Sequence, residues 1–206
     1  MVGGFCLKEL LQGKHYARVK ILVRRPLDLR HPKLEQHIVD FDRRETFENL
    51  LAADDAFSCL GTTRAKTSSR ELYRSIDFDI PCKIARLAIE RGAKRLSIVS
   101  SVGADPKSPF FYPRLKGEID QEVARLPFEA VHIFRPSLLL GRRDESRLTE
   151  KLMQRAAPLY AWLCVGPWRR YRPIRAEAVA QAMVRAALSD EGGVQIHEFS
   201  RIMGAL

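Results

Sequence analysis

A tyrosine and a lysine in the middle of the chain have the types and spacing needed to move a proton to or from a carbonyl group. Tyr112 and Lys116 stand four residues apart at the start of a predicted helix, so both side chains lie on one helix face. A free tyrosine has a pKa of about 10, and a cation within about 4–6 Å favours the phenolate and lowers that pKa toward neutrality. Such a phenol can serve as a general acid or base. On their own, the two residues fit an ordinary surface pair equally well.

A hydroxyl group is available just upstream of this pair. The apolar and β-branched residues of 96–100 predict a buried strand, and Ser100 and Ser101 stand where it ends, followed by Val102 and Gly103. A hydroxyl at a strand end can hold a substrate oxygen and stabilise the negative charge that develops there. Serine, tyrosine and lysine together are the groups that a carbonyl reductase requires.

These residues resemble the active site of the short-chain dehydrogenase/reductase superfamily, in which the three types occur in this order and at about this spacing. The chain is similar in particular to the atypical branch of the Tat-interacting-protein oxidoreductases and their bacterial relatives. Four further segments carry that resemblance over nearly the whole chain: 19–25 (VKILVRR), 59–64 (CLGTTR), 112–118 (YPRLKGE) and 134–141 (FRPSLLLG). The family pattern favours Ser101 as the active-site hydroxyl, because Ser100 is one register position away and should point to the opposite face.

The hydrophobic pattern along the chain predicts the elements that must position these residues. Short apolar strands alternate with helical segments, which is typical of a parallel α/β sheet. We expect strands at 19–23, 37–41, 56–60, 96–100 and 131–134, and helices at 5–12, 46–53, 117–126 and 175–188. The segment 69–91 should form two helical pieces that Pro81 interrupts, with Asp77 in a structural role. The expected architecture is one Rossmann-type, doubly wound NAD(P)-binding domain over 1–206, with 142–174 as a substrate-side insert.

The start of the chain departs from the family pattern. A dinucleotide-binding fold should open with a strand that leads into a glycine-rich turn, where backbone amides and a helix N-terminus hold the pyrophosphate. This sequence opens with Met1, Val2 and two glycines before a predicted helix, so only Gly3 corresponds to the family's Gly-x-x-Gly-x-x-Gly turn. We therefore expect a sheet without its first, central strand, and impaired cofactor binding in this N-terminally truncated form. A misplaced start, a fragment and a naturally rearranged fold all fit this expectation.

The remaining cofactor contacts are assigned by position. Arg24 and Arg25 follow the second strand of the family fold, where arginine accommodates a 2′-phosphate, so NADP is favoured over NAD. An exposed basic pair is the alternative. The resemblance adds contacts at strand ends and on the catalytic helix, namely Asp40, Leu60, Gly61, Thr62, Thr63, Tyr112, Lys116, Pro136, Ser137 and Leu138. For several of these, a simple turn or a rigid loop explains the residue as well.

Composition and charge narrow the function classes. The net charge of +10 comes from dispersed basic residues, so we expect a solvated surface and no nucleic-acid interface; a salt titration of binding would test that alternative. No apolar run approaches the roughly 18 residues of a membrane span, and no secretory signal is recognisable. The four cysteines lack a C-x-x-C spacing and the five histidines lack a metal-ligand spacing. We therefore expect reduced thiols, a cytoplasmic location and no metal.

The sequence thus predicts an NADP-dependent oxidoreductase of the short-chain type that acts on a small carbonyl or alcohol substrate. The alternative is a non-catalytic NAD(P)-binding protein with a regulatory or interaction role. The substrate itself is not specified by the sequence, and a protein partner and a homodimer stay open.

Overall fold

Parallel strands form the centre of the molecule in the computed structural model, which describes residues 1–62, 67, 69–140 and 166–204. A four-stranded sheet has the order β3-β4-β5-β8, with β3 at Asp55–Ser58, β4 at Arg95–Val99, β5 at Ala130–Phe134 and β8 at Gly193–His197. A separate pair consists of β1 (Val19–Val23) and β2 (Leu34–Ile38), and a short pair of β6 (Leu139–Leu140) and β7 (Ile174–Arg175). Every one of these strand pairs is parallel.

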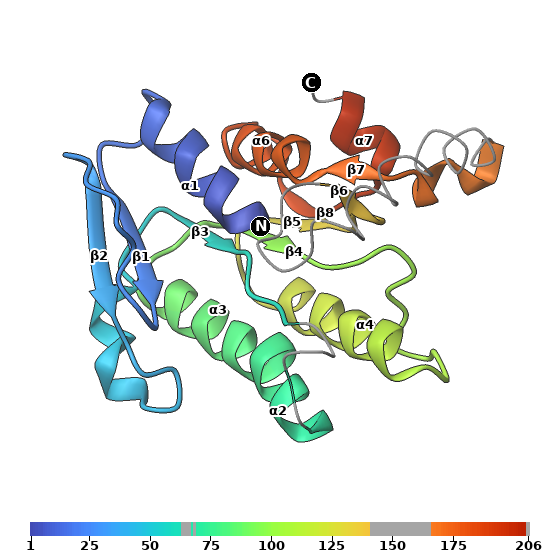
Figure 1. The fold of residues 1–206 in the computed structure, drawn as a ribbon, viewed down its shortest axis with the longest axis horizontal. Coiled ribbons are helices and arrows are strands. Elements are labelled where there is room, and N and C mark those ends of the chain that lie inside the picture. Colours follow the sequence, from blue (N-terminus) through green and yellow to red (C-terminus); the bar gives the residue numbers. More distant parts are fainter. Residues whose placement is uncertain (63–66, 68, 141–165, 205–206) are drawn as a thin grey trace.

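Helices cover both faces of the four-stranded sheet (Figure 1). One layer holds α1 (Val2–Gln12), α6 (Ala176–Ala187) and α7 (Phe199–Gly204), and the other holds α2 (Arg70–Arg74), α3 (Ile80–Glu90) and α4 (Phe111–Ala124). Two apolar clusters fill the space between layers: Phe134 packs with α1 and α6, whereas Ile98 and Ile133 pack with α3 and α4. This arrangement confirms the predicted doubly wound α/β fold of the Rossmann type. None of the described helices is long and apolar enough to cross a membrane.

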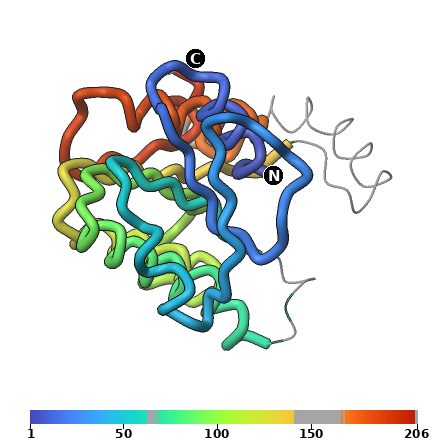
Figure 2. Tube along the Cα trace, turned by 90° about the vertical axis from the view of Figure 1, so that its left-hand side faces the viewer, coloured from blue at the N-terminus to red at the C-terminus, as the bar shows by residue number. Residues whose placement is uncertain are grey.

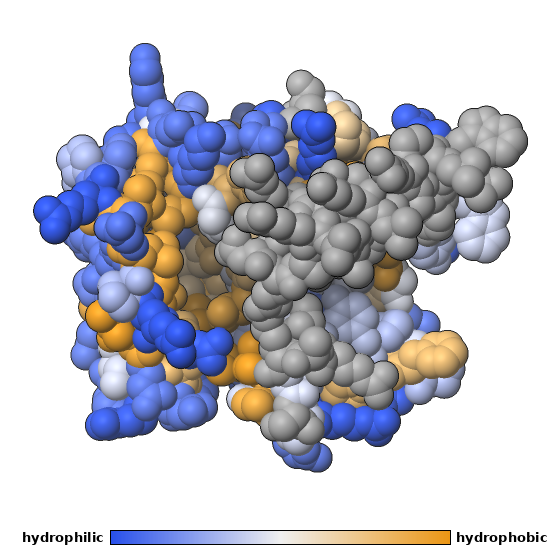
Figure 3. Space-filling view, viewed as in Figure 1, coloured by the Kyte–Doolittle hydropathy of each residue, from blue (hydrophilic) through white to orange (hydrophobic). Residues whose placement is uncertain are grey.

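The parallel strands are interrupted between β1 and β3. Among the described residues no strand lies between them, and Figure 2 shows β1 and β2 as a pair of their own on this side of the molecule. Side chains bridge the interval: the Tyr16 hydroxyl donates to Asp55 at 2.7 Å, and the Lys20 ammonium donates to the carbonyl of Ala52 at 3.2 Å. In the space-filling view, apolar side chains surround a hollow at this place (Figure 3). The expectation of a sheet that lacks a central strand is confirmed for the described residues.

Two predicted elements differ from the structure. The helix expected at 46–53 is replaced by two short 3-10 helices, Arg44–Thr46 and Glu48–Leu50, because fully buried Phe47 packs beside Phe41 instead of forming part of a helical stripe. The strand expected at 37–41 lies three residues earlier, as β2. The apolar residues Val39 and Phe41 that suggested the later position belong to the core beyond the strand end.

The helical region before the catalytic segment contains an irregular turn. Between α2 and α3, residues Ser75–Asp79 form a π-helical turn. Pro81 lies in the first turn of α3, directly after this π-helical turn. The prediction of two helical pieces is therefore correct, but the interruption precedes the proline and includes Asp77. Such turns are frequent at functional sites.

Candidate active site

Tyr112 and Lys116 project from the first two turns of α4, as their spacing predicts. The Lys116 ammonium lies 5.9 Å from the centre of the Tyr112 ring. Tyr112 is 40% exposed, whereas Lys116 is 4% exposed. The phenol can therefore reach a small molecule from solvent while the ammonium stays behind it in the protein.

Gly117 explains how α4 and the loop that carries Ser101 fit together. A Cβ atom at Gly117 would lie 2.1 Å from the backbone nitrogen of Pro106, which is far inside van der Waals contact. The same loop donates a backbone hydrogen bond of 3.0 Å from Asp105 to the carbonyl of Pro113. Only glycine permits this close approach, so the glycine that follows Lys116 lets the serine loop pack against α4.

Asp77 is the residue that the sequence analysis missed, since we interpreted it as structural. Its carboxylate lies 2.7 Å from the Lys116 ammonium, and the two side chains are 1% and 5% exposed. The other carboxylate oxygen accepts a hydrogen bond of 2.7 Å from the backbone N–H of Thr62. A buried charge requires such pairing. Asp77 therefore links the end of β3, where cofactor contacts were predicted, to the predicted catalytic residue Lys116.

Aromatic rings surround the phenol of Tyr112. The Tyr73 ring meets those of Tyr112 and Phe111 edge to face, with centroids 6.2 and 5.7 Å apart. Burial and the charge of nearby Asp77 raise the pKa of Tyr73, and its hydroxyl donates to the carbonyl of Thr62. Tyr73 thus stays protonated and serves as a wall of the site.

The two serines have different surroundings. Ser101 is partly buried, and its hydroxyl makes a hydrogen bond of 3.3 Å to the carbonyl of Val102. Ser100 is buried on the side of Asp120, one helical turn beyond Lys116. Burial raises the pKa of Asp120 despite the opposing influence of Ser100, Arg135 and Lys116, and Arg135 donates to its carboxylate at 2.9 Å. The described contacts do not join the Ser101 hydroxyl to Tyr112.

The predicted cofactor residues fall into two groups. Those after β3 and β5 lie at carboxyl ends on either side of β4 in the central sheet. The N–H of Val102, after β4, donates to the carbonyl of Pro136, after β5, at 2.9 Å. Pro136 is buried, Leu138 is exposed, and the Ser137 hydroxyl donates to the carbonyl of Arg172. Leu60, Gly61 and Thr62 follow β3, whereas Thr63 lies outside the described residues.

The second group lies on the separate β1–β2 pair and on α1. Arg24 and Arg25 are exposed directly after β1, and Asp40 is exposed after β2, where its carboxylate accepts the N–H of Asp42. Gly3 stands in the first turn of α1, and a Cβ atom there would meet that of Cys59 at 3.2 Å. Of the predicted insert at 142–174, residues up to 165 lie outside the described part of the chain.

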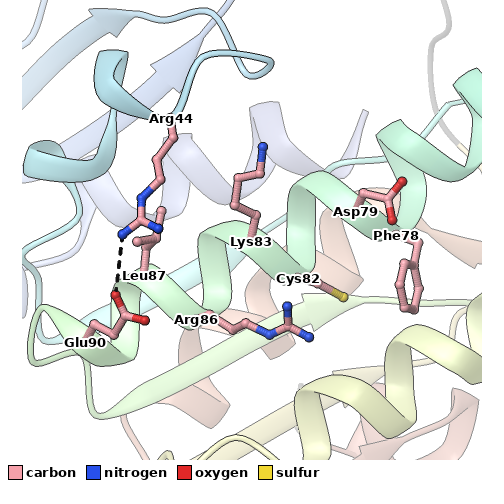
Figure 4. Close-up of a pocket in the computed structure, with 8 residues that line it drawn as sticks. All are labelled: Arg44, Phe78, Asp79, Cys82, Lys83, Arg86, Leu87 and Glu90. Carbon is pink, nitrogen blue, oxygen red and sulfur yellow. Dashed lines mark ion pairs between the residues drawn. The ribbon is translucent and has the colours of Figure 1, made fainter.

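A cavity of about 330 Å³ lies elsewhere, along the outer side of α3 (Figure 4). It is lined by charged residues with three less polar ones among them: Arg44, Phe78, Asp79, Cys82, Lys83, Arg86, Leu87 and Glu90. Arg44 and Glu90 form an ion pair of 3.9 Å at one end. None of the predicted catalytic residues lines it.

Comparison with known proteins gives relatives along most of the chain, although no family model matches it. Protein HTATIP2 of Rattus norvegicus is 36% identical over 157 residues, which cover 74% of this chain and 64% of that protein. Protein FMP52, mitochondrial, of Coccidioides immitis is 32% identical over 209 aligned residues, which cover 95% of this chain and 85% of that protein. The corresponding protein of Aspergillus niger is 32% identical over 196 residues, or 90% of this chain and 84% of its own length.

Solved structures share the fold at low sequence identity. A UDP-N-acetylglucosamine 4-epimerase from Methanobrevibacter ruminantium superposes with a TM-score of 0.68 at 14% identity, covering 96% of this chain and 73% of its own. The enzyme WbmH of Bordetella bronchiseptica, in complex with NAD+, superposes with a TM-score of 0.70 at 12% identity, covering 96% of this chain and 72% of its own.

The expected cytoplasmic location is contradicted by these relatives. Several FMP52 proteins that match most of the chain are named mitochondrial. The physical reason for the error is that reduced cysteines and an ordinary apolar content occur in proteins of several compartments, so they do not specify a subcellular location.

Proposed function

Since the chain belongs to the family of the HTATIP2 and FMP52 proteins, an atypical branch of the short-chain dehydrogenase/reductases, we propose that it is an NADP-dependent oxidoreductase acting on a small carbonyl or alcohol substrate. The observation that carries this proposal is the exposed phenol of Tyr112 in front of the buried ammonium of Lys116. The fold alone would not carry a function.

The residues present offer contacts to a nicotinamide dinucleotide, and the missing central strand and glycine-rich turn should weaken its binding in this form. The first turn of α1 contains no acidic residue and no capping side chain, so its backbone N–H groups are available to a phosphate. Arg24 and Arg25 offer two exposed cations to a 2′-phosphate. Residues 60–62 and 136–138 lie at strand ends, where such cofactors bind in open α/β sheets. Bound NADPH would supply a hydride to the carbonyl carbon.

Tyr112 is the proton donor in this proposal. Its hydroxyl transfers a proton to the carbonyl oxygen as the alcohol forms, and the phenolate left behind regains a proton from solvent through its exposed side. Lys116 stabilises the negative charge on the phenolate, and Asp77 holds the ammonium in place. Ser101 would orient the carbonyl oxygen by a hydrogen bond after turning from the carbonyl of Val102.

The experiment is carbonyl reduction followed by NADPH absorbance, with Tyr112→Phe as the test variant. Phenylalanine keeps the ring that packs on Tyr73, so the fold and NADPH binding should be retained. Turnover should fall by roughly 10²- to 10⁴-fold, the usual contribution of a general acid. Phe110→Leu, at an exposed neighbouring position, is the control and should keep the activity. Turnover that survives in Tyr112→Phe would contradict the assignment.

A non-catalytic NAD(P)-binding role is the second candidate. It is favoured by the ion pair that already engages Lys116 and by the Ser101 hydroxyl, which bonds to a backbone carbonyl. In that case the unmodified protein binds NADPH, measured by calorimetry, and reduces no member of a panel of aldehydes and ketones. If the protein reduces any compound of the panel and Tyr112→Phe abolishes that activity, the catalytic function is supported and the non-catalytic one is excluded.

A further inference from the structure

Two histidines that are far apart in the chain meet on the central sheet. His132 lies on β5 and His197 ends β8, the neighbouring parallel strand. The Nδ1 atom of His132 is 3.1 Å from the Nε2 atom of His197. The side chains are 0% and 4% exposed. Spacing along the chain could not reveal this pair, because strand pairing and not sequence distance brings it together.

A carboxylate completes the group. Glu191 stands in the turn before β8, and one ligand atom from each of His132, His197 and Glu191 lies within 4.8 Å of the others. Glu191 is exposed, so solvent reaches the group on this side. Among the residues that the structure describes, these three form the group of histidine, cysteine or acidic side chains whose ligand atoms lie close enough to share a metal ion.

The geometry of the two nitrogens suits a metal ion. With metal–nitrogen bonds of about 2.0–2.1 Å, nitrogens 3.1 Å apart subtend an angle of about 100° at the metal, close to tetrahedral. Neutral imidazoles and a carboxylate are the ligands of many zinc sites.

We propose that His132, His197 and Glu191 form a binding site for a divalent transition-metal ion of the zinc type, with water at the fourth position. Closure requires that exposed Glu191 turn toward the two nitrogens and that the two rings tilt until both nitrogens point to one position. The proton now shared by the ring nitrogens moves to the other nitrogen of the donating ring, so binding releases no proton from the pair. The site faces α6 and α7, because His132 and Phe134 share one face of β5 and Phe134 packs with α6. It therefore lies across the sheet from Tyr112 and does not depend on the proposed function.

Arg201 sets the affinity of this site. Its guanidinium pairs with one oxygen of Glu191 at 2.6 Å and with the side chain of Gln195 at 2.9 Å, which leaves the other Glu191 oxygen for the ion. The nearby guanidinium orients the carboxylate and also repels a cation, so its removal should tighten metal binding.

The alternative is a hydrogen-bonded histidine pair without a metal. That pair satisfies one nitrogen of each ring, and the buried Nε2 atom of His132 has no hydrogen-bond partner among the described residues with or without a metal at Nδ1. Arg201 holds Glu191 in place in both cases, so the titration with the metal decides between them.

The experiment is a calorimetric titration of the full chain with Zn²⁺ after removal of metals with a chelator. We expect one ion per chain, with affinity reduced at least roughly tenfold in Glu191→Gln, since even the loss of an outer partner typically costs 10- to 100-fold. Asp190→Asn is the matched control, an exposed neighbouring carboxylate outside the site, and should leave the affinity unchanged. Arg201→Gln should bind more tightly. Loading with Co²⁺ should give no thiolate charge-transfer band, which excludes the cysteines.

The proposal is overturned by the absence of stoichiometric binding, or by binding that Glu191→Gln leaves unchanged. His197→Gln gives a second readout, checked for folding by circular dichroism, and should also lose binding. Because Glu191 is exposed, its variant does not depend on core packing and remains decisive if His197→Gln fails to fold.

Discussion

The carboxylate of Asp77 lies 2.7 Å from the ammonium of Lys116, and water is almost excluded from both groups. The π-helical turn at Ser75–Asp79 carries the aspartate into this position, and the backbone N–H of Thr62 holds its second oxygen. The charge behind the candidate acid Tyr112 is therefore balanced and fixed from two directions.

The first prediction concerns this ion pair. Asp77→Asn keeps an acceptor for Thr62 but leaves the Lys116 ammonium buried without a counter-charge, so the free energy of unfolding should fall by about 3–5 kcal/mol. Combining it with Lys116→Met should recover much of that loss, because no uncompensated charge then remains. Denaturant unfolding of the single and double variants measures the coupling. Glu118→Gln, which breaks a partly exposed pair with Arg74, should cost less than about 1 kcal/mol.

The fold could be predicted where local pattern and burial agree. The mostly apolar segment Val19–Val23 forms β1 as expected, because a short apolar run between polar turns is typical of a buried strand. The strand β8 was missed, since it lies at the edge of the sheet with Val194 and Ile196 more than 40% exposed, and its five residues show no apolar run. Propensity carries too little information for such a strand, whose existence depends on pairing with β5.

The candidate site could be predicted where it is local in sequence. Tyr112 and Lys116 are one helical turn apart, so α4 alone sets their relationship. Asp77 and the His132–His197 pair could not be found in this way, because a π-helical turn and a strand pairing bring them to their partners. The sequence signal for Asp77 was an acidic residue within the helical segment 69–91, four residues before Pro81.

The second prediction tests the contact between α4 and the serine loop. Gly117→Ala places a Cβ atom against the backbone of Pro106, so the loop must shift, and we expect a loss of about 1–3 kcal/mol in the free energy of unfolding. Gly4→Ala is the matched control, because Gly4 is also helical but has nothing within 4 Å, and it should stabilise by about 0.5–1 kcal/mol. Thermal or urea unfolding of both variants measures the two changes in the free energy of unfolding, which should have opposite signs. Equal effects would show that the loop is not packed on the helix.

The third prediction concerns thiol reactivity. Burial, with a smaller influence of Glu122, raises the pKa of Cys82 to about 12, so its thiol stays protonated at pH 8. A hydrogen bond with the neighbouring Cys59 and burial also raise the pKa of Cys6. Since the thiolate is the reactive form, both residues should resist iodoacetamide in the folded protein and react readily in urea. Peptide mapping by mass spectrometry measures each site, and rapid labelling of Cys82 at pH 8 in the native state would contradict its burial.

The fourth prediction concerns the choice between NADP and NAD. Arg24 and Arg25 are exposed at the end of β1, where we propose that they bind the 2′-phosphate of the cofactor. Because a hydrogen bond to a charged group contributes about 1.5–3 kcal/mol, replacing both arginines by alanine should weaken NADPH binding by roughly 10- to 100-fold and leave NADH binding nearly unchanged. Arg30→Ala removes an exposed cation from the same connection between β1 and β2 and should alter neither affinity. Fluorescence titration of both cofactors gives the ratio directly, which separates recognition of the phosphate from any general weakening of the site. An unchanged ratio in the double variant would assign the two arginines to the solvated surface.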